Sequence, residues 1–421
     1  MYTVYSILLF LSLFYYIPAY LIKHKIIRKE KLNLKERLSF KLPLKVSGRK
    51  SLWIHAVSVG EVLSLRNLIV EIKKNHPDWI IYFSSLTNTG MKMARKKLNL
   101  NNTFYIPFDF KFSVNRFFLK LKPDLFILAE SEFWPNILRV ARKKTKGVIL
   151  INGRISKKSY ERYKRLNFLS RILLSNIKKF LVQSEGDKIK LEKIGVTSDK
   201  IEIAGNLKSE LIPPYIGTSE IRRLRRELNI SLEEKVFVAG STHRNEEQLL
   251  MSAFSKAKKN GKDIRLIIAP RQTDRFDEVY ELCRKFPYKV EKKSMISSQM
   301  QWEILVLDTI GDLAKIYAIS DAAFIGGSLV PWGGHNLLEP AFYSKPIYFG
   351  PYMDNFDFLA NKFLDSGAAE LKSSKKELVE MFSLKDTSKL EKMGKIAKMT
   401  LDSLQGATEK TIKTIEKLMN S

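Results

Sequence analysis

Cysteine and metal-binding motifs are nearly absent from this sequence. Cys283 is the single cysteine in 421 residues, which excludes an intrachain disulfide and fits a reducing compartment. The chain has no Asp-x-Asp motif, no His/Asp cluster with metal-ligand spacing and no zinc-finger spacing. We therefore expect no metal and no other cofactor.

Acidic residues are scarce relative to basic ones. The chain has 44 Asp and Glu against 73 Lys and Arg, a formal net charge of +29. Such an excess favours an anionic partner, either nucleic acid or a membrane surface with anionic headgroups. No zinc-finger or aromatic-interleaved RNA-binding pattern is present, which argues against nucleic acid. The charge therefore indicates an anionic membrane surface.

Charged residues are also missing from the first 21 positions after the initiator methionine. Tyr2 to Ile22 is long enough to cross a hydrocarbon layer of about 30 Å as a helix, and five basic residues follow it between 23 and 31. We predict a membrane anchor over residues 1–22 and a basic juxtamembrane segment over 23–49, with the remaining domains in the cytoplasm. Pro18 and the aromatic cluster at 14–16 leave an interfacial helix as the alternative.

Apolar runs alternate with amphipathic helical patterns in two successive sets. This alternation predicts α/β domains, each a doubly wound parallel sheet with helices on both faces. The first domain is expected over 50–210, a Pro- and Gly-containing linker over 211–219, and the second domain over 220–400, with a final helix over 401–421. The expected strands are 52–59, 79–86, 124–129, 147–151, 180–183 and 201–204, then 236–239, 264–268, 304–307, 322–325 and 347–349.

A glycine-rich loop follows the expected strand 322–325. It contains Gly326, Gly327, Gly333 and Gly334, and we expect His335-Asn336 to open a helix that carries Glu339. Glycines allow close approach of a ligand to the backbone, and a helix N-terminus offers free N–H groups to an anion. The layout suits a nucleotide, with its phosphate at the start of the helix and its ribose on the carboxylate.

The loop GGSLVPWGGHNLLEP resembles the signature of the Kdo (3-deoxy-D-manno-octulosonic acid) transferases of lipopolysaccharide synthesis. Further blocks of the same resemblance occur in one order along the chain: WIHAVSVGEV (53–62), ESEFWPN (130–136), INGRIS (151–156), VQSEGD (182–187), GNLK (205–208), AGSTHRNEE (239–247) and APRQTDRF (269–276). Together they span most of residues 50 to 356, so the resemblance does not depend on one short motif.

The resemblance implies a GT-B glycosyltransferase, with two Rossmann-like domains facing a cleft and a C-terminal helix that packs back on the N-terminal domain. Such an enzyme would transfer Kdo from CMP-Kdo to lipid IVA, the lipid A precursor, at the cytoplasmic side of the inner membrane. Two alternatives remain open: a GT-B transferase with a UDP-sugar donor, or a non-catalytic membrane-bound scaffold.

Four residues of the first domain are candidates for catalysis. The resemblance assigns Glu61 the role of general base in a metal-independent, inverting transfer, and a helix dipole favours its ionised form. Glu130 and Glu132 follow a strand two residues apart, and we expect them to share one face of an extended chain. Lys208 is expected to stabilise the leaving CMP phosphate.

The expected CMP pocket lies at the strand ends of the second domain. Its members are Ser241, Thr242, His243, Pro270, Arg271, Gly311, Asp312, Leu313, Gly333, Gly334, His335, Asn336, Leu337, Leu338 and Glu339. Asp312 stands where we associate the family with glutamate, and a structural hydrogen bond is the alternative role for His55 and His335. Basic residues of the first domain are candidates for contacts to lipid phosphates: Arg66, Lys92, Arg95, Lys96, Lys97, Lys158, Arg162, Lys164 and Arg165.

Overall fold

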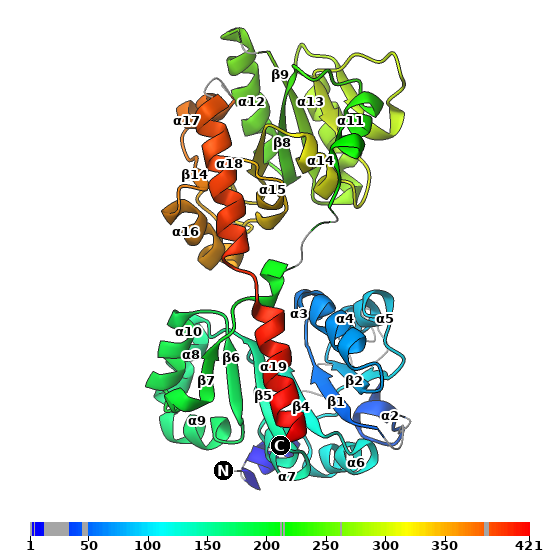
Figure 1. The fold of residues 1–421 in the computed structure, drawn as a ribbon, viewed down its shortest axis with the longest axis vertical. Coiled ribbons are helices and arrows are strands. Elements are labelled where there is room, and N and C mark those ends of the chain that lie inside the picture. The colour runs from blue at the N-terminus through cyan, green and yellow to red at the C-terminus, as the bar shows by residue number, and fades with distance from the viewer. Residues whose placement is uncertain are drawn as a thin grey trace. The chain divides into compact units, whose positions relative to one another are not determined.

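A computed structural model of the protein describes residues 2–3, 5–11, 33–43, 49–210, 213, 215–261, 263–382 and 387–421. The chain forms two compact units (Figure 1). Unit 1 contains Met1–Leu211 together with Leu404–Ser421, and unit 2 contains Ile212–Ser403. The chain therefore leaves unit 1, builds unit 2 and returns to unit 1 with its last residues.

Unit 1 is built on a seven-stranded parallel sheet with the order β3-β2-β1-β4-β5-β6-β7. Its strands are β1 (Ser51–His55), β2 (Ile80–Ser85), β3 (Thr103–Tyr105), β4 (Leu125–Ala129), β5 (Gly147–Gly153), β6 (Lys179–Val182) and β7 (Ile201–Ile203). Its helices are α2 (Leu34–Arg37), α3 (Val59–Ser64), α4 (Arg66–Asn75), α5 (Asn88–Lys97), α6 (Lys111–Leu121), α7 (Pro135–Lys144), α8 (Lys157–Arg165), α9 (Asn167–Leu174), α10 (Glu185–Lys193) and α19 (Ala407–Asn420), with the 3-10 turns η2 (Ser198–Lys200) and η3 (Leu207–Glu210).

Successive strand residues of this sheet enter two different cores, because side chains alternate between the faces of a strand. Leu52 and Ile54 of β1 pack with α4, α5 and α19, whereas Trp53 between them packs with α6 and α7. The C-terminal helix α19 contributes Ile415, which is fully buried in the first of these cores. Figure 1 shows α19, drawn in red, running along this sheet.

Unit 2 repeats the plan with a second seven-stranded parallel sheet, in the order β10-β11-β9-β8-β12-β13-β14. Its strands are β8 (Lys235–Thr242), β9 (Ile264–Pro270), β10 (Val290–Lys292), β11 (Ile304–Val306), β12 (Ala322–Ile325), β13 (Ile347–Phe349) and β14 (Ala369–Leu371). Its helices are α11 (Thr218–Glu227), α12 (Glu246–Lys259), α13 (Phe276–Arg284), α14 (Leu313–Ile319), α15 (Leu338–Phe342), α16 (Asp357–Asp365), α17 (Lys375–Met381) and α18 (Thr387–Asp402), with the 3-10 turns η4 (Thr273–Arg275), η5 (Lys293–Met295) and η6 (Asp354–Phe356).

The predicted α/β architecture with parallel sheets is confirmed, and the strands missed by the sequence pattern share one property. β3, β10 and β14 are three residues long and lie at or near the sheet edges. Unlike the equally short β11 and β13, each of them contains a polar residue (Thr103, Glu291 or Glu370), so no continuous apolar run marks it in the sequence.

Most of the predicted anchor and juxtamembrane segment lies outside the described residues, which omit 12–32 and 44–48. Residues 5–11 are helical, and we refer to 2–3 and 5–11 together as the N-terminal segment. Among the described residues, no helix combines the length and the apolar character needed to cross a membrane. Residues 211, 212 and 214 of the expected linker are also outside the described part.

Candidate active site

Each sheet has a point at which the strand order reverses direction. In unit 1 this point lies between β1 and β4, and in unit 2 between β8 and β12. Ligands of open parallel sheets bind beyond the carboxyl ends of strands at such points. Glu61 and Glu130 follow β1 and β4, and Thr242 and Gly326 lie at the ends of β8 and β12. The two switch points thus carry many of the residues proposed from the sequence.

Glu61 lies in the first turn of α3 and completes a capping box with Ser58. Its carboxylate accepts the backbone N–H of Val57 at 2.8 Å on one oxygen and that of Ser58 at 3.3 Å on the other. The hydroxyl of Ser58 in turn accepts the backbone N–H of Glu61 at 3.3 Å. The side chain is therefore fixed in place and is only 7% exposed.

The pKa of Glu61 is raised, contrary to the lowering expected from the helix dipole. Burial is the main cause, the N–H of Val57 opposes it, and the negative charge of Glu130 adds to it. A carboxylate with a raised pKa is a stronger base than one in water. The environment of Glu61 therefore strengthens its basicity.

Glu130 and Lys208 form an ion pair. The Nζ of Lys208 lies 2.8 Å from Oε1 of Glu130. Glu130 has φ of 61°, so the chain turns sharply after β4 and the extended arrangement expected for Glu130 and Glu132 is wrong. Lys208 sits in η3 beside this turn, with its charge directed at a carboxylate of the protein.

Glu132 is half-buried between Glu130 and the helix α8. Burial raises the pKa of Glu132, the positive charge of Arg162 opposes this rise, and the charge of Glu130 adds to it. The same Glu132 charge raises the pKa of Tyr163, which burial raises most. Glu61, Glu130 and Glu132 thus form one electrostatically coupled group, bordered by Lys208 and Arg162.

In unit 2, the buried carboxylate of Glu246 holds the ends of β8 and β12 together. One oxygen accepts the N–H groups of His243 (2.9 Å) and Gly327 (2.6 Å), and the other accepts those of Ser328 (2.9 Å) and Leu329 (2.8 Å). Burial raises the pKa of Glu246, although all four N–H groups oppose this rise. The sequence analysis missed this residue, although it stands inside the block AGSTHRNEE.

The last residues of β8 face the glycine-rich loop. Ser241 has φ of 59°, and the pairing with β9 shifts register between Gly240 and Thr242. The hydroxyl of Thr242 is buried and has no hydrogen-bond partner within the described structure. Arg271, directly after Pro270 at the end of β9, donates its backbone N–H to the carbonyl of Thr242 at 3.0 Å.

His243 and His335 are joined by a hydrogen bond of 2.7 Å between their Nε2 atoms. Burial lowers the pKa of both rings, that of His335 to about 4, and the charge of Arg271 contributes to both shifts. Trp332 stacks on His243 with its ring centroid 4.6 Å away. The structure thus places His243, His335 and Trp332 in contact, with the charge of Arg271 acting on both imidazole rings. That His243, His335 and Arg271 bind CMP stays a prediction.

The glycines of the loop are needed where the backbone passes close to other groups. A Cβ on Gly326 would lie 2.3 Å from the carbonyl oxygen of Ser241, and Gly333 and Gly334 have φ of 85° and 72°. The helix begins at Leu338, so the expectation that His335-Asn336 opens it is wrong. Asn336 instead caps the turn, because its Oδ1 accepts the N–H of Leu338 at 3.1 Å.

Helix α14, which follows Asp312, lies close to Glu339 through the side chain of Tyr317. Burial raises the pKa of Glu339, which a hydrogen bond from Asn336 opposes. Burial is the main cause that raises the pKa of Tyr317, and the charge of Glu339 adds to it. The hydroxyl of Tyr317 occupies the place where a Cβ on Gly240 would stand. Helix α14 therefore connects β8 with α15.

Asp312 precedes α14 and is already paired. Its Oδ2 lies 2.9 Å from the Nζ of Lys293 and 2.5 Å from the hydroxyl of Thr309. Burial raises its pKa, but these two partners outweigh it and the net pKa is lowered. Gly311 has φ of 94° with open space at its Cβ position, and the partly buried Leu313 packs against a core of unit 2. Within the described ranges, no group of three or more His, Cys, Asp or Glu side chains could hold a metal ion.

Comparison with known proteins gives consistent similarities. Residues 32–211 match the family profile described as 3-Deoxy-D-manno-octulosonic-acid transferase (kdotransferase). A 3-deoxy-D-manno-octulosonic acid transferase of Rickettsia felis is 32% identical over 334 residues, covering 78% of this chain and 70% of the relative. A bifunctional glycosyltransferase/methyltransferase of Fusobacterium nucleatum is 38% identical over 323 residues, covering 74% of this chain and 49% of the relative, so the chain spans about half of that protein.

Solved structures share the fold. UDP-GlcNAc 2-epimerase from Neisseria meningitidis superimposes with a TM-score of 0.60 over 87% of this chain and all of the neighbour, at 12% identity. At this identity the similarity concerns the fold alone.

Proposed function

Because the chain belongs to the family of 3-deoxy-D-manno-octulosonic acid transferases, we propose that it transfers Kdo from CMP-Kdo to lipid IVA with Glu61 as the general base. The transfer would invert the anomeric carbon and use no metal. Lipid IVA, the acylated and phosphorylated disaccharide, would be met at the anionic surface of the inner membrane, which the net charge of +29 favours.

The observation that carries the catalytic assignment is the environment of Glu61. Its carboxylate is fixed by two backbone N–H groups, and both burial and Glu130 raise its pKa. A general base works best when its pKa approaches the operating pH, because it must be ionised and yet bind a proton well. Glu61 would take the proton of the acceptor hydroxyl as that oxygen attacks the anomeric carbon and the bond to CMP breaks.

In the proposal, the proton transfer to Glu61 is supported by Glu130, Glu132 and Lys208. Glu130 keeps the basicity of Glu61 high, and the ion pair with Lys208 at 2.8 Å offsets part of the accumulated negative charge. The pairing argues against Lys208 as a free phosphate ligand. We therefore propose that Lys208 acts by positioning Glu130.

The second switch point would hold the CMP group. Arg271 offers a guanidinium that matches phosphate or carboxylate oxygens, and the lowered pKa values of His243 and His335 leave them neutral near pH 7, as hydrogen-bonding partners. The buried hydroxyl of Thr242 needs a partner, which a donor oxygen would supply. Asn336 and Glu339 would bind ribose or base.

Glu61→Gln tests the proposal with purified enzyme, CMP-Kdo generated in situ and a tetraacylated lipid acceptor. Gln keeps the size of the side chain but removes its basic oxygen, so turnover should fall by about 10²–10⁴-fold while CMP affinity is unchanged. Glu377→Gln is the matched control, because Glu377 closes the same kind of capping box on α17. E377Q should keep full turnover.

Turnover, melting temperature and nucleotide binding test different parts of the proposal. Turnover of E61Q within a few-fold of wild type would refute Glu61 as the base. A large loss of melting temperature in E61Q, but not in E377Q, would assign the effect to folding instead. Titration of the wild type with CMP and UDP tests the donor: preferential binding of UDP would refute CMP-Kdo.

A further inference from the structure

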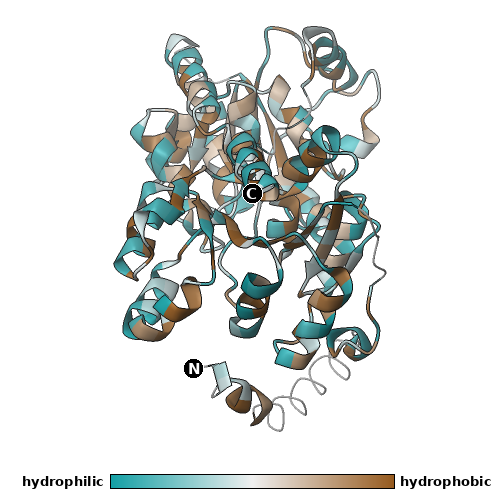
Figure 2. Ribbon diagram, turned by 60° about the horizontal axis from the view of Figure 1, so that its bottom comes forward, coloured by the Kyte–Doolittle hydropathy of each residue, from teal (hydrophilic) through white to brown (hydrophobic). Residues whose placement is uncertain are grey.

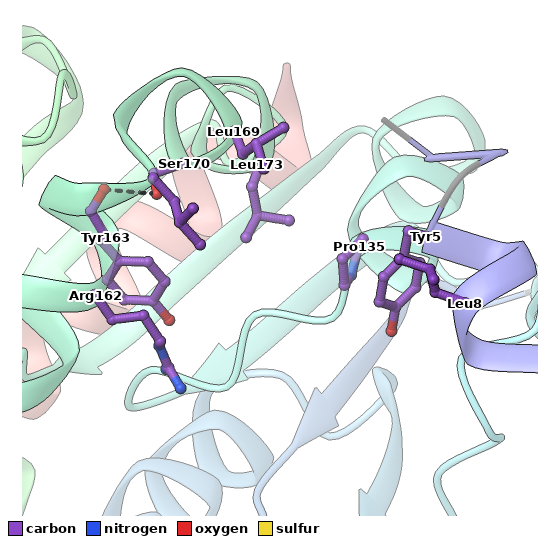
Figure 3. Close-up of a pocket in the computed structure, with 9 residues that line it drawn as sticks. Tyr5, Leu8, Pro135, Arg162, Tyr163, Leu169, Ser170 and Leu173 are labelled. Carbon is purple, nitrogen blue, oxygen red and sulfur yellow. Dashed lines mark hydrogen bonds between the residues drawn. The ribbon is translucent and has the colours of Figure 1, made fainter. Parts of the chain in front are cut away.

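An apolar pocket of about 490 Å³ lies in unit 1 between the N-terminal segment and helices α8 and α9. Ligand pockets in proteins usually measure about 300–1,000 Å³ and are mostly apolar with a few polar groups. The lining residues are Tyr5, Leu8, Pro135, Arg162, Tyr163, Leu166, Leu169, Ser170 and Leu173. Figure 3 shows Tyr5, Leu8 and Pro135 on one side, across from the residues of α8 and α9.

Polar contacts fix the wall of the pocket that the N-terminal segment forms. Tyr5 hydrogen-bonds to the buried Asp109, and Asn136 donates to the hydroxyl of Ser6 at 3.2 Å. The amide of Asn176 donates to the hydroxyl of Tyr2 at 2.8 Å. These contacts hold the polar side of the segment on unit 1 and leave Leu8 60% exposed. The apolar character of this segment is visible as brown ribbon near the N-terminus in Figure 2.

Arg162 and Tyr163 connect the pocket with the acidic group of the candidate active site. Both line the pocket, and the charges of Arg162 and Glu132 interact. Glu132 in turn interacts with Glu130, which interacts with Glu61. A ligand in the pocket would therefore have its polar end beside the residues proposed for catalysis.

The surface around the pocket is apolar at its centre and basic beyond it. Leu166, between α8 and α9, is 49% exposed and Leu169 of α9 is 41% exposed although both line the pocket. The neighbouring Phe168 is 75% exposed. The preceding helix α8 carries Lys157, Lys158, Arg162, Lys164 and Arg165. An occupant of this region should combine a hydrocarbon chain with an anionic head group.

We propose that this pocket receives one acyl chain of the lipid acceptor, while Arg162 binds a phosphate of its head group. The inference rests on the proposed function, because it names the pocket through which that acceptor reaches Glu132 and Glu61. The chain would leave water for an apolar pocket, and each methylene buried in this way strengthens binding about fourfold. The head group would then be oriented by a charge-assisted contact.

Binding of dodecyl phosphate below its critical micelle concentration tests the pocket without turnover. Leu169→Trp and Leu8→Trp fill it from opposite walls and should weaken binding about tenfold, the equivalent of two lost methylene contacts. Phe168→Trp is the matched control, because Phe168 is exposed on the same helix and does not line the pocket. F168W should bind as the wild type does.

The phosphate contact is tested separately. Arg162→Ala should weaken dodecyl phosphate about tenfold and leave dodecyl maltoside, which has no charge, unaffected. Arg142→Ala removes the same charge from the neighbouring helix α7, does not touch the pocket and should change neither ligand. With the enzyme assay, L169W and L8W should raise KM for the acylated acceptor but not for its deacylated head group.

The outcomes separate the inference from the proposed function. Unchanged binding and KM in both L169W and L8W would overturn the pocket assignment even if Kdo transfer is observed. An equal loss in F168W would also overturn it, because it would show a generic apolar surface. If the wild type binds dodecyl phosphate as expected but transfers no Kdo, the pocket stands and the proposed function fails.

Discussion

The side chain of Glu61 has two roles. The same oxygens that would accept a proton in catalysis also cap helix α3. The position of such a residue in the first helical turn, after a strand, is readable from the sequence. Its raised pKa is not, because that depends on burial and on Glu130, almost 70 residues away in the chain. The residue types and the strand ends of this site could therefore be predicted from the sequence. Which charged side chains lie close together there could not.

The coupling of Glu61 and Glu130 predicts a shift in pH dependence. Glu61 must be ionised to act as a base, so kcat/KM should fall as the pH drops through its raised pKa. Glu130→Gln removes a negative charge and leaves Lys208 unpaired, and both changes lower this pKa. The acid limb should move to lower pH in E130Q and to higher pH in Lys208→Met, as measured by pH profiles of kcat/KM. Movement of both variants in the same direction would contradict the coupling.

Glu246 gives a prediction about stability. Glutamine at this position would direct an NH₂ group at two of the four backbone N–H groups that the carboxylate accepts. Glu246→Gln should therefore lower the free energy of unfolding by about 2–5 kcal/mol, because buried donors lose their acceptor. Denaturant unfolding measures this loss. Glu281→Gln, at a side chain 62% exposed, should change it by no more than about 0.5 kcal/mol.

At the scale of elements, apolar runs in the interior of each sheet were predictable, because buried parallel strands need continuous apolar sequence. β12 (Ala322–Ile325) and β13 (Ile347–Phe349) have the predicted bounds. The start of α15 at Leu338 was not predictable in the same way, since Asn336 and the positive φ of Gly333 and Gly334 keep the preceding residues out of the helix. Local hydrogen bonds decided that boundary.

Helix α19 should contribute strongly to the stability of unit 1. Ile415 is fully buried against the first sheet, so Ile415→Ala should cost about 2–5 kcal/mol through lost burial and a new cavity. Lys417→Ala, on the exposed side of the same helix, should have an effect within about 0.5 kcal/mol. Thermal and denaturant unfolding compare the two variants, and an equal effect would contradict the packing.

At the scale of the whole molecule, the net charge of +29 predicts salt-dependent binding to membranes. The protein should sediment with phosphatidylglycerol vesicles in 0.1 M salt, where charges are screened over about 10 Å, and less in 1 M salt, where the distance is about 3 Å. Phosphatidylcholine vesicles should bind less protein at the lower salt concentration. Equal binding to both vesicle types there would refute an electrostatic contribution.

The return of α19 to unit 1 also has a consequence for synthesis on the ribosome. The core around β1 lacks Ile415 and its neighbours until residues 212–403 have been translated. At about 5–20 residues per second, this interval lasts on the order of tens of seconds. During that time the nascent first unit exposes an apolar sheet face that α19 later covers. A chaperone that binds nascent chains should therefore remain on unit 1 while unit 2 emerges.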